Sequence, residues 1–511
     1  MYLFFPFCSI PFLSLFIYFL GNPMDLRAIH RTKIEETVFK GFRCAWSILV
    51  HDKITSNLIN SLFKKSDLLD FYITGVFSIE NKIPKWNLPI IYFVNCTKEI
   101  SRVINDEFKK ENHPPIQVYS LCEPEGLDEA IECIVAPLNI EAREERIFVC
   151  GQNNLLSLEN VLDCRFKISY ENCAKDLAQQ IEKDLTKDLI DGRKEATLLV
   201  LDRTLDIFTP FMYFFTFRTM ISEIGSPDCN DSFFPEIRNK HLGEVNGVLQ
   251  NSVKKLQESF EKLNAKNVDI EALDTMVLEA PKSIELKENI EKYTNYINKA
   301  FQKLEIIKDV AEIQQNLILG TDKEGNKITF ALDNYLPIMF SPAMDFEDRL
   351  NLLFLLKAKG IVLSETEKNL FKSKGFNKAD LDLIFKQRNQ VLRVKQRKTE
   401  FEISRYEPVI LDVVESFVTH SREFPSFGQK IQKFDSLRKS CMLNSNKATK
   451  NILVVYVNNG LSIEELKLAY LISENFGIEC FFGSNKILKK SQFIQEFRTN
   501  KELQEIQFTE K

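Results

Sequence analysis

Asp202, Arg203 and Asp206 are the residues whose types and spacing could perform chemistry. Asp202 and Arg203 directly follow the apolar run Leu198–Leu201, which is too short for a helix and predicts a strand buried on both faces. The carboxyl end of such a strand is where several phosphoryl-transferring α/β enzymes hold an aspartate nucleophile. Those enzymes usually need a second acid two residues later, and Thr204 occupies that position here. The residues therefore favour a structural turn held by ion pairs or backbone hydrogen bonds over a hydrolase or phosphatase that uses Asp202.

No other catalytic or metal-binding pattern is present in the sequence. It contains no GxxxxGK[ST], GxSxG or HExxH motif. The 11 cysteines show no CxxC or CxxH spacing and resemble buried thiols in a reducing compartment. We therefore predict no enzymatic activity, no cofactor and no metal. The five histidines are scattered along the chain, at His30, His51, His113, His241 and His420.

The overall composition is that of an ordinary globular protein. The 511 residues are enough for two to four domains, with 44% hydrophobic and 27% charged residues. The net charge of −5 does not indicate nucleic-acid binding, for which a basic protein would be expected. Residues 1–23 form an uncharged apolar segment, which we interpret as an upstream extension before a working start at Met24, with a membrane anchor as the alternative.

Alternating strand and helix patterns predict two parallel sheets. Short apolar runs at 46–51, 72–77, 89–94 and 116–121 alternate with polar helical stretches such as Lys98–Lys110. A second α/β unit is predicted from the strand at Ile147–Cys150, a helix at Asp176–Asp188 and the central strand at 197. Near the C-terminus the same pattern returns, with strands at 452–457 and 479–482 around a helix from Ile463 to Phe476.

The segment that follows the central strand is predicted to be helical. Pro210 fits the first turn of a helix, and Phe214, Phe217 and Ile221 recur at helical spacing. Beyond it, two heptad-like seams predict a helical hairpin whose connection, Asn264–Ser283, contains Pro281. The seams are Leu249, Val253, Leu256, Phe260 and Leu263, and then Ile290, Tyr293, Ile297, Ala300, Leu304, Ile307 and Ala311.

Several motifs in this order resemble the Sec/Munc family, whose members bind syntaxins and other SNAREs and control membrane fusion. The central motif is Leu-Asp-Arg-x-x-Asp-x-x-x-Pro at 201–210, followed by Phe-Thr-Phe-x-x-Met at 215–220. The downstream motifs look closest to the exocytic, Sec-like branch. The remaining segments that carry the resemblance are Pro235–Val245, Asn316–Ile328, Ile403–Pro408 and Gly483–Leu488.

The resemblance implies a three-domain arch of two parallel-sheet α/β domains and a mainly helical insertion. The expected ranges are 24–142 for the first domain, 143–228 with 404–511 for a discontinuous second domain, and 229–403 for the helical domain. It implies a chaperone and regulator of SNARE assembly in vesicle docking and fusion, acting as a monomer on a syntaxin-type SNARE and on the assembled SNARE complex. The expected location is cytoplasmic, peripheral to plasma or vesicle membranes. A rigid tethering scaffold that never contacts SNAREs is a third possibility.

The resemblance also assigns candidate binding residues in the first domain. Asp52 and Lys64 match an acidic and a basic position of the cleft that grips syntaxin, and Asn57 stands where relatives commonly carry arginine. Tyr119, Leu127 and Ile131 fall near a pocket that holds an N-terminal SNARE peptide in several relatives.

In the hairpin, the resemblance makes Pro281 a hinge. A proline at the matching place limits how far the second helix extends backward, and the extended helix serves as a template for SNARE pairing. We therefore expect the second helix to start near Lys287, with Ile290, Tyr293 and Ile297 on its template face. Two basic runs, Lys386–Lys398 and Lys430–Lys450, could meet anionic lipid or an acidic SNARE face.

Overall fold

The computed structural model of the protein describes residues 23–40, 46–81, 87–110, 113–185, 193–225, 231–263, 270–328, 331–341, 344–386, 401, 404–427 and 451–499. The predicted apolar extension up to residue 22, residues 387–398 of the first basic run and the run Lys430–Lys450 lie outside these residues. The chain divides into two compact units. Unit 1 comprises Met1–Arg203, Glu415–Leu461 and Leu468–Ile487, and unit 2 comprises Thr204–Val414, Ser462–Lys467 and Leu488–Lys511. The three domain ranges predicted from the sequence do not coincide with these two units, and they stay a prediction.

The first sheet of unit 1 has five parallel strands in the order β2-β1-β3-β4-β5. Along β3, alternate residues enter two different apolar cores, Ile91 and Phe93 in one, Tyr92 and Val94 in the other. Because both faces are buried, the strand reads as an unbroken apolar run rather than an alternating one. The strands are β1 (Ser47–His51), β2 (Ile73–Ser78), β3 (Ile90–Val94), β4 (Ile116–Ser120) and β5 (Cys133–Val135).

The second sheet of unit 1 has six strands in the order β6-β7-β12-β10-β9-β8. All neighbouring strands are parallel except β6 and β7. The central strand β9 pairs with β10, from the C-terminal part of the chain, so distant segments complete one sheet. The strands are β6 (Glu141–Glu144), β7 (Ile147–Val149), β8 (Cys164–Tyr170), β9 (Lys194–Asp202), β10 (Ile452–Asn458) and β12 (Glu479–Ser484), and two short strands, β11 (Leu461–Ser462) and β13 (Ile487–Leu488), pair with each other.

Helices connect the strands of unit 1, as the alternating pattern predicts. The predicted fold class, two parallel-sheet α/β parts with a mainly helical insertion, is therefore confirmed. The helices are α2 (Leu26–Ile34), continued by a π-helical turn (Glu35–Phe39), then α3 (Lys53–Leu62), α4 (Lys65–Asp70), α5 (Lys98–Phe108), α6 (Leu155–Leu162), α7 (Lys175–Leu185) and α17 (Lys467–Phe476).

The seven cysteines among the described residues are all free thiols. Cys96, Cys150, Cys164 and Cys480 are buried, and burial raises the pKa of each of these thiols. A thiol whose pKa is raised is mostly protonated and is a poor nucleophile. These four cysteines therefore act as small apolar core residues, in keeping with their sequence pattern.

His30 of α2 is fully buried in unit 1. One ring nitrogen, Nε2, lies 3.0 Å from the carbonyl oxygen of Leu138, while Nδ1 is buried with no hydrogen-bond partner among the residues that the structure describes. Burial lowers the pKa of His30 from 6.5 to about 4, although the contact with the Leu138 carbonyl opposes the shift. The histidine is thus neutral in the folded protein at neutral pH.

We expect His30 to make unit 1 less stable in mild acid. Between pH 6.5 and about 4 the unfolded chain binds a proton on this residue and the folded chain does not, so stability is full above pH 6.5 and falls below it. The loss reaches about 3 kcal/mol at pH 4. Denaturant unfolding of the native chain and of His30→Gln across this pH range should show a shallower decline in the variant. His113→Gln, at a half-buried position, is the control and should follow the native curve.

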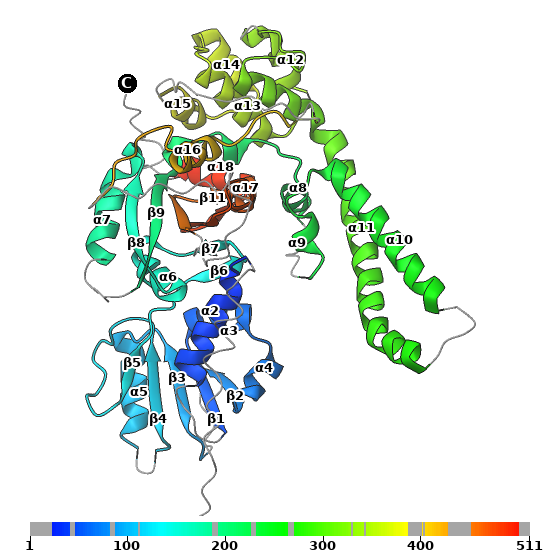
Figure 1. Ribbon diagram of the computed structural model, residues 1–511. Coiled ribbons are helices and arrows are strands. Elements are labelled where there is room, and N and C mark those ends of the chain that lie inside the picture. Colours follow the sequence, from blue (N-terminus) through cyan, green and yellow to red (C-terminus); the bar gives the residue numbers. More distant parts are fainter. Residues whose placement is uncertain are drawn as a thin grey trace, which may run out of the picture. The chain divides into compact units, whose positions relative to one another are not determined.

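Unit 2 is mainly helical. Its two longest helices, α10 (Leu242–Leu263) and α11 (Ile270–Leu319), run side by side as an antiparallel pair (Figure 1). The second predicted seam is buried: Ile290, Tyr293 and Ile297 are each at most 9% exposed. The other helices are α8 (Phe217–Glu223), α9 (Phe234–Ile237), α12 (Leu336–Met339), α13 (Phe346–Ala358), α14 (Glu365–Ser373), α15 (Lys378–Lys386) and α18 (Lys490–Thr499), and α16 (Val409–Val418) begins in unit 2 and ends in unit 1.

The predicted start of the second hairpin helix near Lys287 is wrong. Helix α11 begins at Ile270, so Pro281 lies inside the helix and not in the connection. An interior proline costs a helix about 3 kcal/mol, through the lost N–H donor and a clash with the carbonyl four residues earlier. The residues before it, from Ile270 to Ala280, contain strong helix formers and no glycine. A 50-residue helix packed along a partner supplies enough contacts to include an unfavourable residue.

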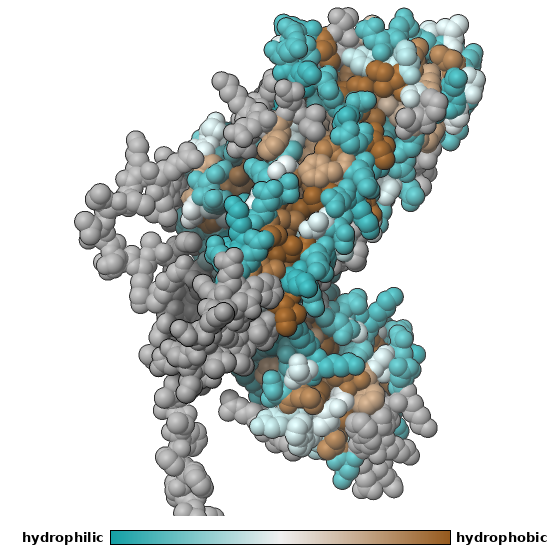
Figure 2. All heavy atoms as spheres, turned by 90° about the vertical axis from the view of Figure 1, so that its right-hand side faces the viewer, coloured by the Kyte–Doolittle hydropathy of each residue, from teal (hydrophilic) through white to brown (hydrophobic). Residues whose placement is uncertain are grey.

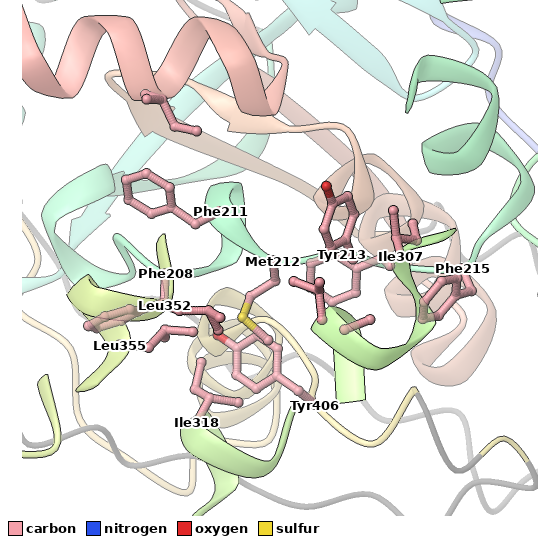
Figure 3. Close-up of a cluster of buried hydrophobic side chains, with 14 of the residues drawn as sticks. Phe208, Phe211, Met212, Tyr213, Phe215, Ile307, Ile318, Leu352, Leu355 and Tyr406 are labelled. Atoms are coloured by element: carbon pink, nitrogen blue, oxygen red, sulfur yellow. The ribbon is translucent and has the colours of Figure 1, made fainter. Parts of the chain in front are cut away.

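The helix predicted to begin at Pro210 is also wrong. Pro210 lies in a single 3₁₀ turn, Thr209–Phe211, and α8 starts only at Phe217. The intervening residues, 212–216, all bury their side chains. Figure 3 shows Met212, Tyr213 and Phe215 among the other hydrophobic side chains of this cluster. A helix would leave one face of this segment towards solvent, whereas a non-helical chain can bury every side chain in succession. Side chains from other segments satisfy its backbone, since Asn351 donates to the Phe211 carbonyl and the Tyr213 N–H donates to Gln314.

Candidate partner-binding site

Asp52 lies at the end of β1 and caps the N-terminus of α3. Its Oδ1 accepts hydrogen bonds from the backbone N–H and hydroxyl of Thr55, at 2.8 and 3.0 Å. Its Oδ2 accepts the N–H of Asn95 at 2.7 Å, and only 6% of the residue is exposed. Asp52 is therefore engaged in joining β1, α3 and the loop after β3, which positions the surface of α3.

Asn57 and Lys64 are the two exposed members of the predicted SNARE-binding set. Asn57 lies on α3, and Lys64 lies at the junction between α3 and α4. The amide N–H of Lys64 donates to Asp67, and Arg31 of α2 forms an ion pair with Asp67 at 2.9 Å. These contacts lower the pKa of Asp67 and hold the junction in place. Sequence reasoning missed Arg31, although its spacing of four from Arg27 on one helix was a usable signal.

Exposed apolar side chains gather beside this junction. Strand β2 is an edge strand and packs against α4. The rings of Trp46 and Tyr72 meet edge to face, 5.5 Å apart, while remaining 48% and 61% exposed. Leu69 of α4 and Val76 of β2 are 52% and 40% exposed. We name Trp46, Leu69, Tyr72 and Val76 the β2 edge patch; exposed aromatic residues of this kind are enriched at protein interfaces.

The three residues predicted to line an N-terminal peptide pocket differ in their exposure. Tyr119 is fully buried, its hydroxyl has no hydrogen-bond partner among the described residues, and burial raises its pKa. Ile131 is buried in the core on one side of the first sheet, and Leu127 packs partly against that core. Of the three, only Leu127 therefore presents surface to a peptide.

The hairpin buries its predicted template face within unit 2. Tyr293 and Ile297 pack in the core of this unit and Ile290 is buried as well, so the surface open to another helix is formed by other residues. On α11 these include Ile284 at 61% and Ile306 at 66% exposure. Figure 2, which faces the hairpin, shows hydrophobic residues in a line bordered by hydrophilic ones.

Asp206 connects two of the signature segments in unit 2. Its carboxylate accepts the N–H groups of Phe208 and Thr209, at 3.1 and 3.0 Å, and the hydroxyl of Thr209. It also accepts the hydroxyl of Tyr406 at 3.3 Å and the N–H of Val409 at 3.1 Å. Asp206 is fully buried, so this carboxylate organises the turn that contains Pro210 and ties it to the segment around 406.

Two further signature segments, Asn316–Ile328 and Pro235–Val245, contact the segment around residue 405. The guanidinium of Arg405 donates to the carbonyl of Thr321 and to the side chain of Asn316. The ring of His241 stacks on Phe401 and lies 3.2 Å from the hydroxyl of Ser404. The segments around residues 206, 241, 316–321 and 404–406 are thus joined by side-chain contacts in unit 2, whereas most of Gly483–Leu488 belongs to unit 1. These contacts explain the residue types of the joined segments by folding.

Asp202 forms hydrogen bonds that join two neighbouring strands, and the alternative of a hydrolase that uses Asp202 is not supported. Its Oδ2 accepts the side-chain amides of Asn458 and Asn459, at 2.9 and 3.3 Å, across the ends of β9 and β10. Arg203 beside it is fully buried.

Over the residues that the structure describes, no group of three or more His, Cys, Asp or Glu side chains could hold a metal ion. Within the same residues, none of the helices is both long and apolar enough to cross a membrane.

Comparison with known proteins identifies the fold. The Unc18–syntaxin 1 complex of Monosiga brevicollis matches with a TM-score of 0.76 and 16% identity, over 93% of this chain and 99% of that one. The SM protein Vps45 in complex with the Qa SNARE Tlg2 matches with a TM-score of 0.73 and 16% identity, over 95% and 100% of the two chains. The fold is therefore that of the SM proteins.

The sequence comparison agrees with the structural one. The Dictyostelium discoideum protein named protein transport protein sec1 is 22% identical, over 89% of this chain and 95% of its own length. The profile of the Sec1 family matches residues 47–496. The chain belongs to the Sec1 family, and the resemblance noted in the sequence is confirmed.

Proposed function

We propose that this chain binds a syntaxin-type SNARE, free or in the assembled SNARE complex, and regulates the docking and fusion of transport vesicles. The observation that carries the proposal is membership of the Sec1 family across residues 47–496. Two structurally similar proteins, Unc18 and Vps45, were solved in complex with a syntaxin and with a Qa SNARE. We further propose that the chain acts without enzymatic activity, as a peripheral partner of plasma or vesicle membranes, in the exocytic branch.

The exposed face of α3 and α4 is the surface we propose for the SNARE. Lys64 supplies a cation that has no side-chain ion pair among the described residues, and Asn57 supplies an amide. The β2 edge patch, on α4 and on the edge strand that packs against it, supplies apolar and aromatic area. A few aromatic anchors with a charged rim are the usual source of affinity in protein interfaces. With Asn57 in place of the family's common arginine, Lys64 carries a larger share of the charge contact.

Reversing this charge tests the surface. We expect Lys64→Glu to weaken binding of the cytosolic region of a syntaxin-type SNARE by about threefold to fivefold, because an exposed ion pair contributes little and is screened by salt. Isothermal titration calorimetry at low salt measures the change. Lys98→Glu, an equal charge change at the exposed start of α5, is the control. Equal affinities of the native chain and a folded Lys64→Glu variant would remove Lys64 from the site, and a lack of binding to every Qa SNARE tested would refute the proposed function.

A further inference from the structure

Unit 2 contains a cavity of about 230 Å³ that the SNARE surface does not use. It is lined by the segment after Pro210, by α8 and α11, and by the N-terminal ends of α13 and α18. An engineered apolar cavity of about 150 Å³ accepts benzene, so this one has room for a ligand of about nine non-hydrogen atoms.

Seven charged side chains line the cavity, and three of them are already paired or bonded. Lys490 forms an ion pair with Asp348 at 2.5 Å, beside the hydroxyl of Tyr213. Glu464 accepts the hydroxyl of Thr219 and pairs with Lys467. Asp345 caps α13 by accepting the N–H of Asp348. The four that remain are Glu223, Glu347, Lys303 and Lys489.

These four side chains make no hydrogen bond or ion pair with any of the described residues, although both signs of charge are present. Glu223 comes from α8, Glu347 from α13, Lys303 from α11 and Lys489 from the residue before α18. Burial raises the pKa of the Glu223 carboxyl, and the nearby ammonium groups of Lys490 and Lys303 oppose this shift in part. Opposite charges that surround one space without pairing can each be matched by a ligand inside it.

We propose that this cavity binds a small zwitterion that carries an ammonium group at one end and a phosphate or carboxylate at the other. The ammonium group donates hydrogen bonds to Glu223 and Glu347. The anionic group faces Lys303 and Lys489 and the first N–H groups of α18, a 10-residue helix whose N-terminus adds a partial positive charge. A ligand with only one charge leaves the other pair of side chains without a partner and therefore binds more weakly.

O-Phosphoethanolamine is a suitable probe, because it has eight non-hydrogen atoms and both charged groups. Calorimetry with the full chain is expected to show binding with a dissociation constant below about 1 mM. Ethanolamine and inorganic phosphate, each with one of the two groups, should bind at least about tenfold more weakly. Vesicles that contain phosphatidylethanolamine, compared with pure phosphatidylcholine vesicles, distinguish a lipid headgroup from a free metabolite as the source of the same chemistry.

Variants locate the binding in this cavity. Glu223→Gln and Lys303→Met should each weaken phosphoethanolamine binding by about tenfold or more. Lys299→Met, on the exposed side of the same helix α11, should bind like the native chain. Circular dichroism checks that each variant is folded. The proposal is overturned if neither the soluble probe nor the vesicles bind, or if the Glu223 and Lys303 variants bind as the native chain does.

Discussion

Replacing Asp206 by alanine is expected to lower the free energy of unfolding of unit 2 by about 4 kcal/mol. The substitution leaves the N–H groups of Phe208, Thr209 and Val409 without their acceptor, which in the native chain is fully buried. The hydroxyls of Thr209 and Tyr406 lie 2.9 Å apart, so one can donate to the other while the second loses its acceptor. Each unsatisfied buried donor costs about 1–3 kcal/mol, and part of this cost is relieved when the turn opens to water. The loss should appear as a lower denaturation midpoint and as faster hydrogen exchange around residues 206–209.

Two further substitutions test the role of the Asp206 carboxylate, one at the same position and one as a control elsewhere. Asp206→Asn keeps the shape but turns an NH₂ group towards donors, so it should be nearly as destabilising as alanine. Asp309→Ala, at an exposed position of α11, should change stability by less than about 0.5 kcal/mol. A stable Asp206→Ala protein with native exchange rates would show that the network around 406 does not depend on this carboxylate.

Replacing Gly483 by alanine is expected to destabilise unit 1 by about 3 kcal/mol. Gly483 of β12 lies directly opposite Phe148 of β7, and a Cβ at position 483 would overlap the aromatic ring of Phe148. Both residues lie in buried strands, so the ring has no free space to move into. Only glycine therefore fits at position 483, because the aromatic ring of Phe148 occupies the space that a Cβ would need.

A compensating substitution tests this explanation. In the double variant Gly483→Ala with Phe148→Leu, the smaller side chain makes room, so the two effects should be less than additive by about 1–2 kcal/mol. Gly247→Ala, in α10 with no atom within 4 Å of the added Cβ, should be neutral or slightly stabilising. Strict additivity of the two substitutions would place the cost of Gly483→Ala elsewhere.

Short-range patterns in the chain were sufficient for the buried strands, the buried seam of the hairpin and the family. The apolar runs at 89–94 and 452–457 predict strands buried on both faces, and β3 and β10 are such strands. The spacing of Ile290, Tyr293 and Ile297 predicts a buried helical seam, which is present in α11. These features depend on residues a few positions apart, whose relation is set by the period of a strand or a helix.

Features that depend on distant residues needed the tertiary structure. The non-helical path of Met212–Phe215 follows from the burial of its side chains, which outweighs their helical spacing. The extent of α11 beyond Pro281 was missed because the prediction gave the proline more weight than the helix formers before it. Asp52 reads as a surface contact in the sequence, but its hydrogen bonds to Thr55 and Asn95 give it a structural role. The cavity in unit 2 is formed by segments from residue 209 to residue 491, and no pattern along the chain relates them. Charge and apolar character are properties of single residues, whereas burial, pairing and enclosure exist only after the chain has folded.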